Sequence, residues 1–157
     1  MAAVLPGSRL RPHMKATKCT SLAKLHVLAG HHTFTCATPQ EVVGMARAGF
    51  GTDLLLANET VDDLRLAAMA AEQDQAMITV AIDSDATLHA AHRAGIKNVM
   101  IDVNIGLPRC GVAPEHAGRL ADSARSAGLH VRGVMGYEGH LMMVTTHSEK
   151  LEKVEAC

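Results

Sequence analysis

The sequence predicts an α/β fold in which the strands form a parallel sheet. Short apolar runs alternate with helical segments along most of the chain, and strict alternation of this kind is typical of parallel sheets. The 157 residues suffice for one ordinary domain, and 48% of them are hydrophobic while 20% are charged. This balance excludes a disordered chain. No run approaches the ~18 uncharged apolar residues of a membrane span.

The first units of the alternation are marked by proline and by capping residues. Residues 9–15 are predicted to be a strand, since Pro12 cannot lie inside a helix. A helix over 21–29 ends at a glycine. The β-branched residues of 33–38 predict the next strand. The sequence T-P-Q-E then supplies a cap, a proline at the first helical position and a glutamate at the third, which predicts a helix over 39–48.

The later strands are more apolar, and their helices end at glycines. The run D-L-L-L-A-N is almost wholly apolar, as in strands buried on both faces. A serine caps the fourth helix, and a proline opens the fifth. The sequence thus predicts six strand-then-helix units, wound by right-handed crossovers. The later strands are expected at 53–58, 76–83, 97–104 and 129–137, and the later helices at 61–73, 85–94, 114–127 and 148–155.

Two architectures fit this alternation, a doubly wound open sheet and part of a (β/α)8 barrel. A doubly wound nucleotide binder usually has a glycine-rich fingerprint after its first strand, whereas Ala-Thr-Lys-Cys follows here. Polar residues stand instead where several strands end, which is where barrel enzymes have their chemistry. These residues are Lys15, Asn58, Asp83, Asn104 and Tyr137. Since a full barrel has eight units and about 250 residues, we expect a partial (β/α)8 TIM-type barrel, with residues 1–157 as an incomplete domain.

Composition also limits the partners. The formal net charge is −1, and the chain has two Phe, one Tyr and no Trp, whereas nucleic-acid binders are usually basic and stack bases on aromatic rings. No secretory signal is recognisable, and no two of the four cysteines form a C-x-x-C pair. His89 and His92 share a helix face without a third ligand, so no metal site is predicted. We expect a cytoplasmic protein with no nucleic-acid or membrane partner.

Three segments could carry chemistry. Lys15 ends the first predicted strand, on the same face as Arg11 and His13, and a lysine amine at a barrel mouth can form a Schiff base with a carbonyl. The alternative is a solvated basic strand end. Arg109 follows the fifth strand in a loop held by glycine and proline, where it could bind an anion. The alternative is an ordinary surface arginine. Tyr137 lies between glycines that let a flat ligand approach, or in a simple glycine-rich turn.

Together these segments resemble the fold-type III pyridoxal-phosphate enzymes, whose barrels are alanine racemase-like. The likeness is greatest to the D-threonine aldolase and D-serine dehydratase branch, and extends from residue 9 to about 155. R-P-H-M-K-A-T-K is similar to the branch's RPHxKxHK signature, although Thr17 stands where the second histidine is expected. I-D-V-N-I-G-L-P-R-C-G-V is similar to VDVGxxRCG, and G-Y-E-G-H to YEGH. The resemblance implies that Lys15 carries pyridoxal phosphate, that Arg109 lies beside its 3-oxygen, and that Tyr137 and His140 are cofactor-binding.

The resemblance further implies a lyase that cleaves D-β-hydroxy amino acids to glycine and an aldehyde. A D-serine dehydratase-like ammonia-lyase, a non-catalytic carrier of pyridoxal phosphate and an inert fragment are the alternatives. In the family, two more barrel units follow, and after them a C-terminal β-domain. This β-domain holds a divalent metal such as Mn or Zn. We expect these parts to lie beyond Cys157, the 157-residue chain alone to be inactive, and the full-length protein to bind a D-amino acid as a homodimer.

Overall fold

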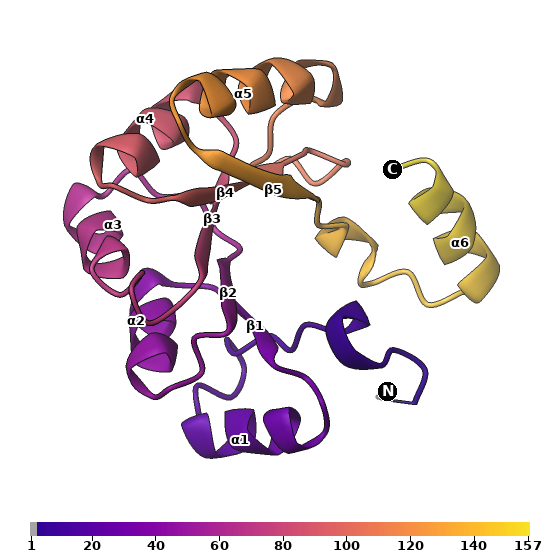
Figure 1. The fold of residues 1–157 in the computed structure, drawn as a ribbon. Helices are drawn as coiled ribbons and strands as arrows, with labels where there is room; N and C mark the ends of the chain where they lie inside the picture. The colour runs from indigo at the N-terminus through magenta and orange to yellow at the C-terminus, as the bar shows by residue number, and fades with distance from the viewer. Residues whose placement is uncertain (1–2) are drawn as a thin grey trace.

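The computed structural model describes residues 3–157 and contains one parallel sheet of five strands in the order β1-β2-β3-β4-β5. The strands alternate with α-helices, which confirms the predicted α/β class (Figure 1). The strands are β1 (Thr33–Cys36), β2 (Asp53–Leu56), β3 (Ile78–Ile82), β4 (Asn98–Asp102) and β5 (His130–Met135). The helices are α1 (Thr20–Leu28), α2 (Pro39–Arg47), α3 (Asp63–Ala70), α4 (Asp85–Arg93), α5 (Pro114–Ser126) and α6 (His147–Glu155), with 3-10 turns η1 (Gly7–Arg9) and η2 (Gly139–Leu141).

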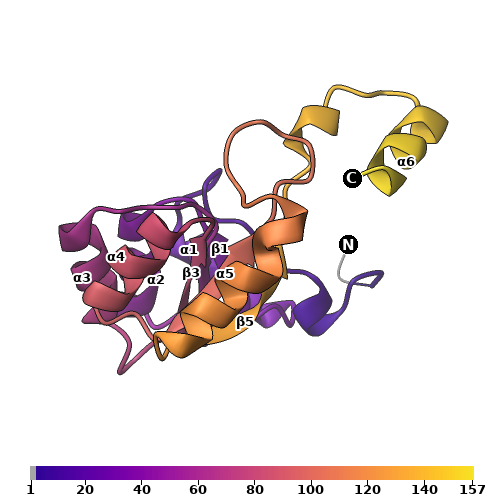
Figure 2. The same cartoon turned by 90° about the horizontal axis from the view of Figure 1, so that it is seen from above.

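The sheet is curved like part of a barrel wall. Helices α1 to α5 follow its convex side, while α6 lies apart across the open concave side (Figures 1 and 2). Alternate strand residues such as Phe34, Leu54 and Ile101 are buried in the core shared with the helices. The other residues of each strand face the interior of the partial barrel. No helix in residues 3–157 has the length and apolar character needed to cross a membrane.

The predicted first strand forms only in part. Residues 9–15 make a single parallel bridge, His13 to Thr35, beside β1. Met14 N–H donates to Thr35 O at 2.8 Å, and Thr35 N–H donates to Pro12 O at 2.9 Å. The predicted strand over residues 9–15 is therefore too long. Pro12 has no N–H to donate to a ladder. The chain also turns at Met14, whose O accepts from Lys18 N–H at 2.8 Å.

The helix starts are those that the capping residues predicted. The Thr38 side chain accepts from Glu41 N–H with proline at the first position of α2, and Ser84 forms a reciprocal capping box with Thr87 at α4. Such caps satisfy backbone N–H groups that have no partner inside the helix. Helix α3 is shorter than predicted, since its cap is Asp62, which accepts from Arg65 N–H. These short units place the strand ends, and the polar residues on them, at one edge of the sheet.

Candidate active site at the carboxyl ends of the strands

A cleft of about 420 Å³ lies at the carboxyl ends of β1, β2 and β5. It contains the side chains of Lys15 and Arg109 and the ring of Tyr137, but no aspartate or glutamate lines it. The other lining residues are His13, Thr35, Ala37, Leu55, Ala57, Asn58, Met135 and Gly136. Two cations without a lining carboxylate favour an anionic ligand.

The structure brings together three of the four site residues predicted from the sequence. Lys15 Nζ lies 5.8 Å from the centre of the Tyr137 ring, and Arg109 Cζ lies 5.4 Å from it. These distances allow attraction between each cation and the electron-rich ring. The three residues come from the segment before β1, the loop after β4 and the end of β5, so only the folded chain unites them.

The Tyr137 ring is fixed by its own neighbours in the chain. Its hydroxyl donates to Met142 Sδ at 3.2 Å. Gly139 approaches the ring so closely that a Cβ at this position would overlap it. Tyr137 therefore presents its ring, rather than its hydroxyl, to Lys15.

His140, the fourth predicted residue, lies outside the cleft. It belongs to η2, and its ring packs against Gly106, where an added Cβ would meet it at 3.1 Å. Its Nε2 is 3.9 Å from Cys157 Sγ. The structure therefore does not bring His140 to Lys15, and a contact between His140 and a cofactor stays a prediction.

His13 holds the backbone at Lys15. Its Nδ1 accepts from Lys15 N–H at 3.2 Å. Burial, followed by the nearby Lys15 charge, lowers the pKa of His13 below its ordinary value, so the ring is neutral at pH 7 and keeps Nδ1 free to accept. Sequence reasoning placed His13 on the face of Lys15 but assigned it no role.

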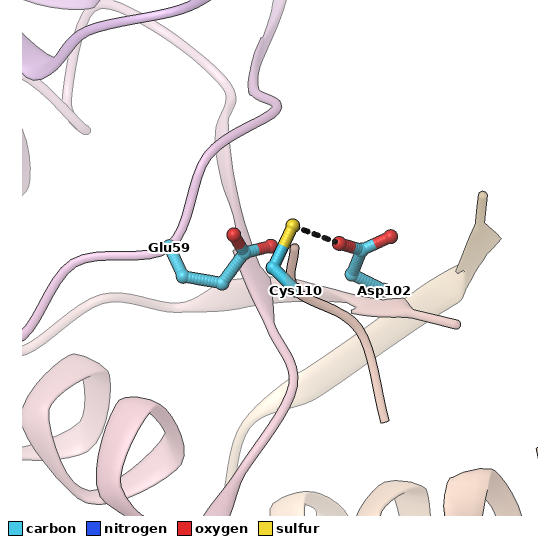
Figure 3. Close-up of side chains that lie close together, drawn as sticks. All are labelled: Glu59, Asp102 and Cys110. Atoms are coloured by element: carbon cyan, nitrogen blue, oxygen red, sulfur yellow. Dashed lines mark hydrogen bonds between the residues drawn. The ribbon is translucent and has the colours of Figure 1, made fainter. Parts of the chain in front are cut away.

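Beside the cleft lies a second cluster, which sequence reasoning missed. One ligand atom each of Glu59, Asp102 and Cys110 lies within 4.8 Å of the others (Figure 3). The Cys110 thiol donates to Asp102 Oδ2 at 3.4 Å and accepts from Arg109 Nε at 3.5 Å. Asp102 is buried at the end of β4. The signal was present, since an aspartate ends the strand and a cysteine follows Arg109, but the spacing alone did not join them to Glu59.

The cluster suits a proton better than a metal ion. Burial raises the pKa of the Cys110 thiol to about 11, so the sulfur is protonated, whereas metal ions bind the thiolate. Burial and the neighbouring Asp102 raise the pKa of Glu59 to about 7. The guanidinium of Arg109 also stands where it would repel a cation. Two carboxyl groups this close share a proton readily.

Comparison with known proteins agrees with the fold and the motifs. The family described as "Alanine racemase, N-terminal domain" matches residues 1–157. The chain belongs to this family. A D-threonine aldolase from Arthrobacter sp is 29% identical over 150 residues, which make up 91% of this chain and 39% of the relative. The resemblance to fold-type III pyridoxal-phosphate enzymes is thereby confirmed.

Solved structures of this family have the same fold. The crystal structure of D-threonine aldolase from Filomicrobium marinum matches with a TM-score of 0.87 and 30% identity, over 93% of this chain and 41% of that one. A D-threo-3-hydroxyaspartate dehydratase mutant matches with a TM-score of 0.76 at 22% identity, over 99% of this chain and 43% of that one, which shows the shared fold alone. The chain thus spans about two-fifths of the length of these relatives.

Proposed function

We propose that this alanine racemase N-terminal domain binds pyridoxal phosphate at Lys15 and belongs to a lyase that acts on D-β-hydroxy amino acids, as a D-threonine aldolase does. The observation that carries the proposal is the convergence of Lys15, Arg109 and Tyr137 on one cleft. A primary amine, a guanidinium and an aromatic ring, with no acidic lining residue, fit a flat anionic aldehyde. The similarity to two D-threonine aldolases at 29% and 30% identity supports the reaction class.

When bound, pyridoxal phosphate would supply an electron sink for negative charge at the substrate's α-carbon. Lys15 would hold its aldehyde carbon through the ε-amine, in a cleft whose lining residues include no carboxylate to compete for it. Arg109 would donate to the 3-oxygen that the pyridine ring carries, since its guanidinium shares one cleft with the Lys15 amine. Tyr137 would form one wall against the ring face, because its hydroxyl is directed to Met142.

The surrounding residues keep Lys15 in place without competing for it. Neutral His13 accepts the Lys15 backbone N–H and adds no further positive charge to the cleft. Thr35 and Leu55 face the interior of the partial barrel and contribute uncharged side chains to the lining of the cleft.

The test is borohydride reduction of the protein mixed with pyridoxal phosphate, followed by peptide mapping. We expect the label on Lys15, none in Lys15→Arg, and unchanged labelling of Lys15 in the matched control Lys18→Arg. A label on Lys18 or Lys24 instead would overturn the assignment. For the substrate class, D-threonine added before reduction should displace Lys15 and abolish the label, whereas L-threonine should not; equal displacement by both would reject selectivity for D-amino acids.

A further inference from the structure

A buried ion network crosses the interior of the partial barrel below the cleft. The side chain of Asp53, at the start of β2, is 11% exposed. Its Oδ2 accepts from Arg11 Nη2 at 2.7 Å. Arg132, on β5, donates to Oδ1 at 2.7 Å and to Oδ2 at 3.0 Å, and also to Thr79 Oγ1 at 2.8 Å. One carboxylate therefore joins β2 and β5 to the segment that leads to Lys15.

The two arginines differ in what else holds them. Arg132 belongs to β5, which pairs with β4 on both sides of a register shift, through His130 and Val131 and through Val134 and Met135. Arg11 belongs to the segment that forms a single bridge with β1. Two backbone hydrogen bonds join that segment to β1, Met14 N–H to Thr35 O and Thr35 N–H to Pro12 O, and the Met14 side chain is buried in the core. Through Arg11, the Asp53 carboxylate adds a charged attachment to a segment with little ladder of its own, whereas β5 is also held by its pairing with β4.

Arg11 is well placed to transmit this attachment. In addition to the bond with the Asp53 carboxylate, Arg11 Nη1 donates to the backbone oxygens of Asp53 at 3.2 Å and of Phe34 at 3.4 Å. Hydrogen bonds between ionised groups are stronger and more directional than neutral ones. Lys15 lies four residues further along, in the turn that begins at Met14, so the chain between the two is short.

We propose that Asp53 is a positioning residue that acts through Arg11 to hold the Lys15 amine at the cleft. The effect on Lys15 reactivity rests on the proposed function of Lys15, whereas the attachment of the segment by Asp53 and Arg11 does not. It goes beyond the motif residues, because Asp53 stands at the start of β2 and is not among the residues that line the cleft. Replacing it would act on the reactivity of Lys15 without removing any residue that lines the cleft.

The ionisation of Asp53 is consistent with this role. Burial alone would raise the pKa of the Asp53 carboxyl, but the hydrogen bonds from Arg132 and Arg11 outweigh it and hold the pKa below its ordinary value. The carboxylate is therefore charged throughout the neutral range, so the attachment does not depend on pH there.

The experiment compares Arg11→Met with the matched control Arg132→Met in the full chain. Backbone hydrogen exchange at Met14 and Thr35 reports the attachment of the segment, and exchange at Val80 and Ile101 reports the stability of the sheet. We expect Arg11→Met to speed exchange at Met14 and Thr35 by about tenfold relative to the sheet amides, and Arg132→Met to leave this ratio unchanged. Equal ratios in both variants, or no change in Arg11→Met, would overturn the proposal.

Labelling by pyridoxal phosphate and borohydride gives the second readout, as the ratio of Lys15 to Lys18 modification. We expect a fall of about tenfold in Arg11→Met and in Asp53→Asn, with the wild-type ratio kept in Arg132→Met. An unchanged ratio in Arg11→Met would show that the attachment does not position the amine. If the wild-type protein is labelled elsewhere than Lys15, the proposed function fails, while the exchange measurement still decides whether Asp53 and Arg11 hold the segment.

Discussion

Lys15 Nζ lies 5.8 Å from the centre of the Tyr137 ring, although the two residues are 122 positions apart in the chain. The contact joins the segment before β1 to the end of β5, at the two sides of the curved sheet (Figure 1). It exists only if the sheet curves as a barrel wall does, since a flat sheet of five strands would hold its two sides apart. The geometry of the cleft is therefore a direct product of the fold.

Replacing Tyr137 tests the role of the ring. The side chain is 37% exposed, so Tyr137→Leu is expected to change the free energy of unfolding by less than about 1 kcal/mol. We expect it to weaken the binding of pyridoxal phosphate by about tenfold, because the wall against the cofactor ring is lost. Tyr137→Phe keeps the ring and should bind as the wild type does. Absorbance titration measures the affinity of both variants for the cofactor, and equal affinity of the wild type and the two variants would contradict this role.

The loop that carries Arg109 depends on Gly111. This residue has φ +97°, and a Cβ would meet Asn104 N at 2.5 Å and the Val103 carbonyl carbon at 2.8 Å. Both atoms belong to the backbone and cannot move aside. Gly111→Ala is therefore expected to destabilise the protein by about 2 kcal/mol.

Gly118 provides the control for this substitution. It lies inside α5, and a Cβ there would meet nothing within 4 Å. Gly118→Ala should stabilise the protein by about 0.5–1 kcal/mol, since alanine is the better helix former. Urea unfolding measures both variants, and a Gly111→Ala protein as stable as the wild type would refute the argument from close approach.

The fold could be predicted largely from local signals. Apolar runs and caps such as Thr38 and Ser84 act over a few residues, so the sequence indicates where the elements begin. The segment around Pro12 was harder, because whether an extended stretch joins a ladder depends on the N–H and C=O groups of its neighbour. Only the partner Thr35, 22 residues beyond His13 (35 minus 13), shows that a single bridge forms.

The candidate site was predictable where a motif contains the residue. Lys15, Arg109 and Tyr137 stand in recognisable segments, and all three line the cleft. Asp53 and Glu59 were not found, because each is defined by partners distant in the sequence. Asp53 meets Arg132 across 79 residues, and no periodicity in the chain indicates such a pair.

The acidity of Glu59 predicts how stability depends on pH. Burial and Asp102 raise its pKa to about 7 from the ordinary 4.5, so the folded state binds a proton that the unfolded state has lost. The stabilisation of the folded state by this proton is present in full below pH 4.5, declines as the pH rises, and is gone above pH 7. Glu59→Gln keeps the neutral form at every pH, so its stability should exceed that of the wild type by an amount that grows from pH 4.5 to about 7 and is constant above.

Chemical unfolding at several pH values measures this difference. A suitable control is Glu115→Gln, in the first turn of α5, where the glutamate is exposed. Its stability relative to the wild type should change little over the same range. A wild-type protein that gains stability from pH 5 to 8 relative to Glu59→Gln would show that the carboxyl is ionised in the folded state.

Arg109 is expected to act on the ligand rather than on the fold. Its side chain is exposed, and its hydrogen bond within residues 3–157 goes to Cys110 Sγ at 3.5 Å, a long contact to a weak acceptor. Arg109→Met keeps the length of the side chain and removes the charge, so the free energy of unfolding should stay within about 0.5 kcal/mol of the wild type.

The same substitution should weaken the binding of pyridoxal phosphate by about tenfold and shift its absorbance, because a charge-assisted hydrogen bond to the ring oxygen is lost. Arg109→Lys retains the charge but not the planar fork, and should recover only part of the affinity. The control is Arg119→Met on α5, whose guanidinium pairs with Asp85 outside the cleft, and which should leave both affinity and spectrum unchanged. If Arg109→Met binds the cofactor with the wild-type spectrum and affinity, the guanidinium does not contact it, and the cleft must hold the anion through Lys15 alone.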